Sequence, residues 1–194
     1  FRLRKPGDTR LVLTPWKNPA MEHPDSYALD VLGLILGHGR TSRLHRALVE
    51  TGLATEADAA NETARDPFLV IALATVAPDR QLAEVEAAIQ DPVARLRRDP
   101  VWGAELRRAK KQVEAGFLYS KDSIQSLSHQ LGYYETIASW RYLEAYPDRI
   151  RAVTAEDVRR AAETYLVEET RTVGWFDPPE PGAAATPAPT GGAA

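Results

Sequence analysis

The chain of 194 residues contains no cysteine, and it has only one methionine and four histidines. Without cysteine it can form neither a disulfide bond nor a thiolate, which excludes thiol nucleophiles and cysteine-ligated zinc sites. The absence of cysteine is compatible with any cellular compartment. Catalysis by this chain would therefore require histidines, serines or carboxylates in a recognisable arrangement.

The histidines show no spacing typical of a metal site. Neither His-Glu-x-x-His nor its inversion, His-x-x-Glu-His, occurs in the sequence. His38 and His45 could lie two turns apart on one helix face, but Gly39 interrupts that helix and no third ligand is evident. We therefore predict that the chain binds no metal ion and no other cofactor, and that its histidines occupy surface or turn positions.

Long apolar runs and an excess of positive charge are also missing. The longest apolar run, 31–36, is far shorter than the ~20 residues of a transmembrane helix. A net charge of −3 and a pI near 5.9 give no electrostatic reason to expect nucleic acid or a membrane as a partner. Basic residues gather at 95–98, 107–111 and 149–160 beside acidic neighbours, which favours solvated helix faces.

Other catalytic motifs are absent too. The glycine-rich segment 37–42 precedes a helix, but it lacks the spacing of a phosphate-binding loop and does not follow a strand, so a helix–helix turn is favoured. No Gly-x-Ser-x-Gly motif occurs. The carboxylate pairs Glu84/Glu86 and Glu168/Glu169 show no sign of burial. The residues themselves thus predict no catalytic set.

Aromatic residues are dense in one region, at Tyr133, Tyr134, Trp140, Tyr142 and Tyr146. Their spacing favours core packing across the kink of a long helix over a binding surface, although both interpretations fit.

Hydrophobic periodicity predicts an α+β fold, with a mainly antiparallel sheet and helices packed on one face. Strands are expected at 10–14, 54–63, 68–76 and 170–176. Helices are expected at 25–37, 41–52, 80–98, 103–137, 140–153 and 155–166. Pro15 should end the first strand, Pro92 and Pro147 should kink or divide their helices, and 119–123 should break the longest one.

The run from His23 to Ala54 resembles the carboxy-terminal domain of pitrilysin/insulinase-type zinc peptidases, a group that includes the mitochondrial processing peptidase and its bacterial relatives. Further similar segments follow in the same order, at Phe68–Val76, Glu105–Gln112, Leu131–Glu135, Ile150–Val158 and Thr170–Gly174. The resemblance covers roughly 8–176.

The resemblance implies one half of a clamshell of homologous domains. Zinc would lie in an amino-terminal domain that carries the inverted His-x-x-Glu-His motif, and this chain would be the domain that follows. The chain begins Phe1-Arg-Leu-Arg-Lys-Pro6, without an initiator methionine or a signal peptide, so we expect it to be cut from a longer protein. Residues 1–7 would end the inter-domain connection, 8–176 would form the domain, and 177–194 would be a flexible Pro/Ala/Gly tail.

Some members of this group also lend an Arg and a Tyr, seven residues apart, to substrate binding after a Ser-Arg-Leu segment. Here Ser42-Arg-Leu44 is present, but Thr55 follows Ala54 where the Tyr would be expected. The residue seven places after Arg46 is Leu53, so that spacing gives no Tyr either. We therefore carry over no catalytic residue. The resemblance then favours either a zinc-bearing subunit whose Arg/Tyr partner is a second homologous chain, or a wholly inactive homologue.

Three hypotheses follow. The first is a non-catalytic carboxy-terminal domain of a zinc metalloendopeptidase, which is inactive alone and helps to enclose a peptide substrate against the amino-terminal zinc domain or a second subunit. The second is a scaffold domain, as in the core subunits of respiratory complexes that share this fold. The third is a separate interaction domain. The resemblance to secreted bacterial members suggests the bacterial periplasm.

Overall fold

The computed structural model describes residues 1–120 and 123–179, so most of the expected tail lies outside the described residues. One five-stranded sheet has the order β1-β5-β2-β4-β3. The strands are β1 (Arg2–Leu3), β2 (Leu11–Lys17), β3 (Ala54–Glu62), β4 (Leu69–Val76) and β5 (Gly174–Phe176). All pairs are antiparallel except β1 with β5.

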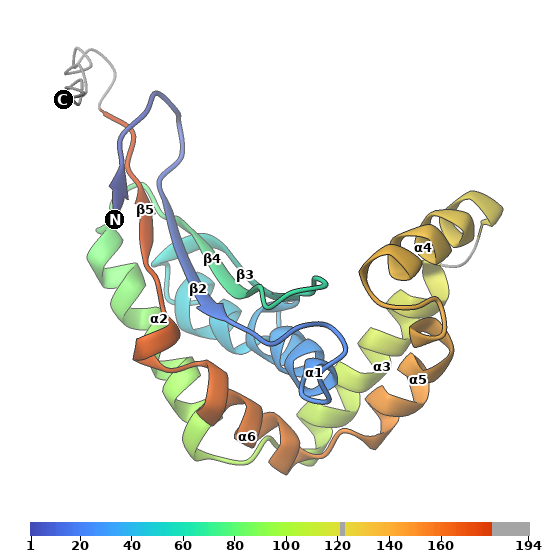
Figure 1. Ribbon diagram of the computed structural model, residues 1–194. Helices are drawn as coiled ribbons and strands as arrows, with labels where there is room; N and C mark the ends of the chain where they lie inside the picture. Colours follow the sequence, from blue (N-terminus) through green and yellow to red (C-terminus); the bar gives the residue numbers. More distant parts are fainter. Residues whose placement is uncertain (121–122, 180–194) are drawn as a thin grey trace.

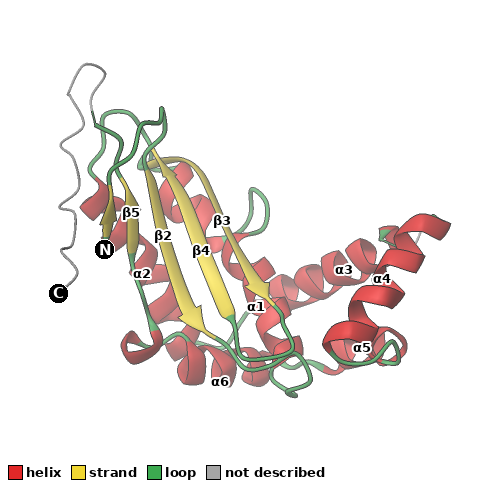
Figure 2. Cartoon of the chain, turned by 45° about the horizontal axis from the view of Figure 1, so that its top comes forward, coloured by secondary structure: helices red, strands yellow, loops and turns green. Residues whose placement is uncertain are grey.

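Helices fill most of the remaining described chain. They are α1 (Ser26–Gly37), α2 (Leu82–Arg98), α3 (Gly103–Tyr119), α4 (Ile124–Ile137), α5 (Tyr142–Ala152) and α6 (Ala155–Tyr165), with a π-helical turn η1 (His45–Val49) and a 3-10 turn η2 (Glu168–Thr170). α1, α2 and α6 lie behind the sheet in Figure 2, and α3, α4 and α5 form an arm beside it (Figure 1). None of these helices is long and apolar enough to cross a membrane.

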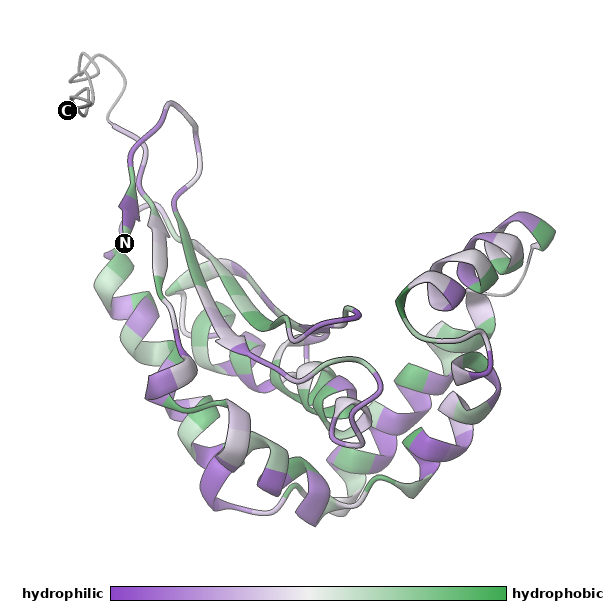
Figure 3. Cartoon of the chain, in the orientation of Figure 1, coloured by the Kyte–Doolittle hydropathy of each residue, from purple (hydrophilic) through white to green (hydrophobic). Residues whose placement is uncertain are grey.

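The core lies between the sheet and the helices behind it. Every second residue of β2, namely Val12, Thr14 and Trp16, is fully buried, as the two-residue period of a strand requires. Hydrophobic residues concentrate in β2, β4 and α1, whereas the outer surfaces of α2 and α6 are more polar (Figure 3). The predicted α+β fold, with a mainly antiparallel sheet and helices on one face, is confirmed.

Two glycines let α1 approach the sheet at its edge. A Cβ atom built on Gly37 would lie 1.8 Å from the backbone nitrogen of Ala59 on β3, and one on Gly33 would lie 3.1 Å from the nitrogen of Asn61. Only glycine fits the contact at position 37, and the contact at position 33 is tight. This close approach brings α1 side chains next to β3, where the cleft described below is formed.

The prolines disturb the elements less than the sequence predicts. β2 continues through Pro15 to Lys17, because the N–H that proline lacks would point to the same side as the Pro15 carbonyl, toward the irregular segment before β5. On that side the Pro15 carbonyl accepts a hydrogen bond from the Thr172 nitrogen. α2 and α5 run unbroken through Pro92 and Pro147. Neither proline therefore divides its helix.

Other boundaries differ in detail. The predicted break in the long helix is confirmed, since α3 ends at Tyr119 and Ser123 caps α4 by accepting a hydrogen bond from the Ser126 nitrogen. The last strand is shorter than predicted, because 168–170 form η2. Arg2–Leu3, which the sequence did not indicate as a strand, pair with β5 at the sheet edge.

Candidate functional site

The face of the sheet opposite the helices is open in the described part of the chain and has an apolar centre. Leu13 on β2 pairs with Leu73 on β4, and Leu73 pairs with Asp58 on β3. The Leu73 side chain is 39% exposed although β4 is an interior strand. Glu56 and Glu62 point the same way as Asp58, so an acidic border on β3 flanks the apolar centre.

A cleft of about 630 Å³ lies between α1 and β3 on one side and α3 and α4 on the other. Residues 58–61 of β3 form one wall, α1 contributes Asp30 and Leu34, and His38 follows directly after α1. Phe117 on α3, with His129 and Tyr134 on α4, belongs to the opposite side. The cleft thus separates the sheet from the helical arm.

Asp30 is the most unusual polar residue of this cleft. The residue as a whole is half-buried, and its carboxylate accepts hydrogen bonds from Asn61 Nδ2 and from the Tyr146 hydroxyl, both at 2.7 Å. The Asn61 oxygen in turn accepts a hydrogen bond from Asn18 Nδ2 at 2.7 Å. Burial raises the pKa of Asp30 to about 6, and the two donors oppose that rise only in part.

A second acidic residue of the same segment is bound differently. Asp25, directly before α1, lies 2.8 Å from Arg160 Nη1 and accepts a hydrogen bond from the Tyr165 hydroxyl. This ion pair fastens α6 to the start of α1. Asp30, in contrast, has only neutral donors, and no described lysine or arginine forms an ion pair with it.

The aromatic cluster joins four helices rather than the two sides of one kink, since Phe117 on α3 also packs on Tyr146. Tyr27 on α1 stacks on Tyr142, and Tyr142 stacks on Tyr134, with centroid distances of 5.5 and 5.6 Å. Tyr142 is buried, whereas Tyr133 remains 45% exposed beside the cleft. Burial, and then the charge of Asp30, raises the pKa of Tyr146. These rings thus serve both as packing between α1, α3, α4 and α5 and as lining of the cleft.

The histidines are dispersed over the structure. His38 and His129 line the cleft from different elements, whereas His23 lies next to Asp25 at the start of α1. In the described residues, no group of three histidine or acidic side chains is close enough to hold a metal ion. The residues present therefore do not fit a zinc site.

The two positions at which an Arg and a Tyr would be expected hold other residues. Thr55 is an exposed residue of β3. Leu48, seven residues earlier, is fully buried in the core and cannot reach a substrate. Sequence spacing revealed this difference, but it did not reveal the Asp30–Asn61–Tyr146 network, whose members come from three distant elements.

Comparison with known proteins places these features in a family. A profile described as the peptidase M16 inactive domain matches residues 1–113. The chain is 25% identical over 164 residues to the zinc protease PqqE of Helicobacter pylori, and this match covers 84% of the chain but only 37% of the relative. The chain thus spans little more than a third of that curated relative.

Solved structures share the same fold. The inactive peptidase domain of a Bordetella parapertussis protein assigned as a zinc protease is 27% identical, with a TM-score of 0.81, 90% of this chain and 96% of that chain covered. A chain of complex III2 from Candida albicans has a TM-score of 0.80 at 14% identity, with 91% and 45% covered, which shows the fold alone. The chain therefore belongs to the peptidase M16 inactive domain family.

Proposed function

We propose that this chain is the non-catalytic domain of a zinc-dependent endopeptidase and that its open sheet face forms part of the wall of a peptide-enclosing chamber. The observation that carries this proposal is the open face itself. Leu13 and Leu73 pair across β2 and β4 at its centre, and Leu73 is 39% exposed, so this face offers apolar surface that a peptide or a facing domain can cover. An extended peptide offers both the apolar side chains and the backbone that such a face can contact.

The zinc and the groups that activate water would belong to an amino-terminal domain of the same protein. The absence of a fitting metal site in the described residues and the limited coverage of the curated relative both support this division. The partners of this chain would be that zinc domain, the peptide and, where an Arg/Tyr pair is needed, a second homologous subunit that supplies it. On the resemblance to secreted members we also propose a bacterial periplasmic location, which cell fractionation tests.

The experiment compares the 194-residue chain with the complete protein. We expect the chain alone to cleave no unstructured peptide and to contain less than about 0.1 zinc ion per chain after dialysis, because residues 1–120 and 123–179 bring no three ligands together. The complete protein should contain about one zinc ion per chain and cleave the peptide. One tightly bound zinc in the chain alone, or cleavage by it, would overturn the proposal.

A scaffold role is the alternative, and two observations favour it as a second candidate. The fold is shared with a chain of a respiratory complex, and the Arg/Tyr positions hold Leu48 and Thr55. The same comparison separates the two functions. A complete protein that binds no zinc and cleaves no peptide would be a scaffold.

A further inference from the structure

The cleft between α1, β3 and the helical arm has a chemical character that the chamber-wall function does not require. Asp30 and Asp58 belong to its lining, together with the rings of Phe117, Tyr133, Tyr134 and Tyr146. No lysine or arginine is among the described residues that line it. The cleft therefore combines negative charge with aromatic surface, and its described lining contains two histidines, His38 and His129, but no lysine or arginine.

Both oxygens of the Asp30 carboxylate accept hydrogen bonds from neutral groups. Two neutral donors fix its orientation, and the amide of Asn61 is itself fixed by Asn18. Hydrogen bonds from neutral groups compensate a buried carboxylate less completely than a positive charge does. The raised pKa of Asp30 reports this incomplete compensation.

The comparison with Asp25 shows that the fold can provide a cation where one is needed for stability. Asp25 pairs with Arg160, and that pair connects two helices. Asp30 lies five residues further along, faces the cleft, and receives no such partner in the described chain. A carboxylate that faces a cleft, has a raised pKa and has no cationic partner among the described residues is a candidate for a binding site.

We propose that this cleft binds an organic cation, an ammonium or guanidinium group, with Asp30 as its carboxylate partner and the surrounding tyrosine rings as its walls. Aromatic faces attract such cations, and the attraction increases when water is excluded. A divalent metal ion is the poorer occupant, because the described residues offer no third carboxylate or histidine close enough to complete its coordination.

The cation could belong to a free small amine or to a lysine or arginine side chain of a bound peptide. The second source rests on the proposed function, since the peptide would then lie along the chamber wall. The chemistry at Asp30 is the same in both cases, and a set of blocked and free amines distinguishes the sources.

The test measures binding to the 194-residue chain by calorimetry at pH 7.5 and low salt. The probes are Nα-acetyl-lysine methylamide, Nα-acetyl-arginine methylamide and n-butylamine, with Nα-acetyl-norleucine methylamide as the neutral control. We expect the cationic probes to bind and the norleucine probe to bind at least about tenfold more weakly. Equal binding of the neutral probe, or no binding of any cationic probe at millimolar concentration, would overturn the proposal.

Two variants assign the binding to Asp30. Asp30→Asn should weaken the cationic probes by about tenfold or more, because it removes the charge and nearly preserves the shape. Asp91→Asn is the matched control, since Asp91 is an exposed carboxylate on α2 outside this cleft, and it should change binding by less than about twofold. Unchanged binding in Asp30→Asn would contradict the assignment.

A second readout does not depend on the folding of any variant. On titration of the unaltered chain, the side-chain amide resonances of Asn61 should shift with the cationic probes, since Asn61 donates to Asp30. Shifts confined to other parts of the chain would contradict the proposal. Tighter binding of the blocked lysine and arginine than of n-butylamine identifies a peptide as the source, and the reverse order identifies a free amine. Neither binding nor its failure depends on zinc or peptide cleavage, so the proposed function is tested separately.

Discussion

Asp30 is the one charged residue of α1, and burial raises its pKa. It lies between Leu29 and Val31, both fully buried, and its carboxylate reaches the cleft at the edge of the core. Its hydroxyl donor, Tyr146, is 116 residues away in the sequence. The sequence could therefore indicate the helix but not the contact, because only the packing of α5 against α1 brings the two side chains together.

The raised pKa of Asp30 leads to a prediction about stability. Between about pH 4 and pH 6 the folded chain binds more protons at Asp30 than the unfolded chain, so the free energy of unfolding falls as the pH rises through this window. Asp30→Asn removes that effect. We expect it to be more stable than the unaltered chain by about 1–2 kcal/mol at pH 7.5, with a smaller difference at pH 4.5.

Urea denaturation at the two pH values measures this difference, with Asp91→Asn as the control. That exposed carboxylate on α2 pairs with Arg95 at the surface, so its removal should change stability by less than about 0.5 kcal/mol at either pH. A loss of stability in Asp30→Asn of the same size at both pH values would show that the hydrogen bonds outweigh the buried charge.

At the scale of elements, most of the predicted helices and strands form, and the errors occur where tertiary contacts override a local rule. Pro15 does not end β2, because its missing donor faces a segment that forms few strand contacts. β1 was not predicted, since a strand of two residues shows no detectable hydrophobic period. Its pairing partner, β5, lies more than 170 residues later in the sequence. The local hydrophobic pattern indicates whether a segment forms a helix or a strand. The ends of that segment depend on tertiary contacts with residues far away in the sequence.

The contact between α1 and β3 gives a prediction about a single glycine. Gly37→Ala would place a methyl group 1.8 Å from the backbone nitrogen of Ala59, so the backbone of α1 or of β3 must shift to accept it. We expect a loss of about 3 kcal/mol or more in the free energy of unfolding, measured by urea denaturation.

Gly132→Ala is the matched control for this substitution. Gly132 lies inside α4, and a methyl group added there would meet no described atom within 4 Å beyond its own stretch of helix. The change should leave stability unaltered or raise it by up to about 1 kcal/mol, because alanine favours a helix. Equal effects of the two substitutions would refute the close packing of α1 on β3.

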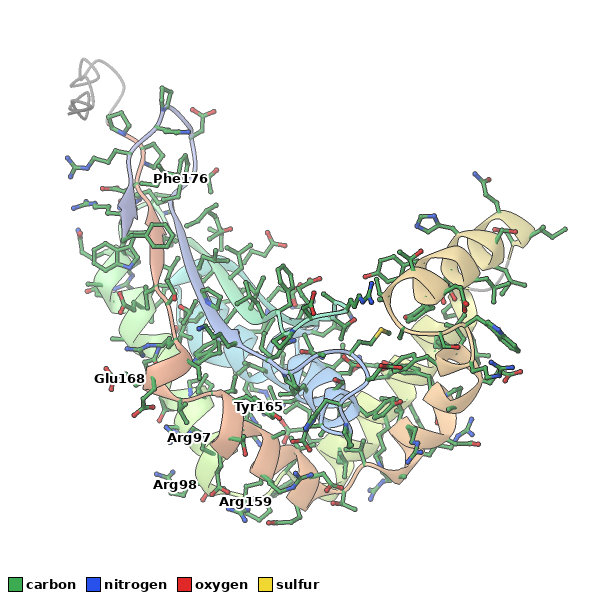
Figure 4. The ribbon with its side chains drawn as sticks, viewed as in Figure 1. Arg97, Arg98, Arg159, Tyr165, Glu168 and Phe176 are labelled. Carbon is green, nitrogen blue, oxygen red and sulfur yellow. The ribbon has the colours of Figure 1, made fainter. Side chains whose placement is uncertain are left out.

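At the scale of the whole molecule, the chain has two different sides. Arg97 and Arg98 on α2 and Arg159 on α6 project from the helical side, away from the sheet (Figure 4). Arg159 pairs with Glu156 and Glu163 on its own helix, so this side carries a solvated charge pattern. The opposite side carries the apolar centre of the sheet and its acidic border. This asymmetry is what the proposed chamber wall requires.

The general form of this asymmetry could be predicted from the sequence, since helices on one face of a sheet leave the other face free. The identity of the residues on the open face could not, because it depends on the register between β2, β4 and β3. The proposed absence of catalytic residues was reached from sequence spacing alone, and it stays a prediction for the metal and activity measurements described above.

The most direct test of the chamber wall is photocrosslinking in the complete protein. A photoreactive phenylalanine analogue replaces Leu73 on the open face or, as the control, Arg97 on the helical side; both side chains are exposed. A labelled, unstructured peptide is then bound under conditions that prevent cleavage. The account predicts a crosslink from position 73 that unlabelled peptide suppresses, and none from position 97. Equal labelling at both positions, or labelling at position 97 alone, would contradict it.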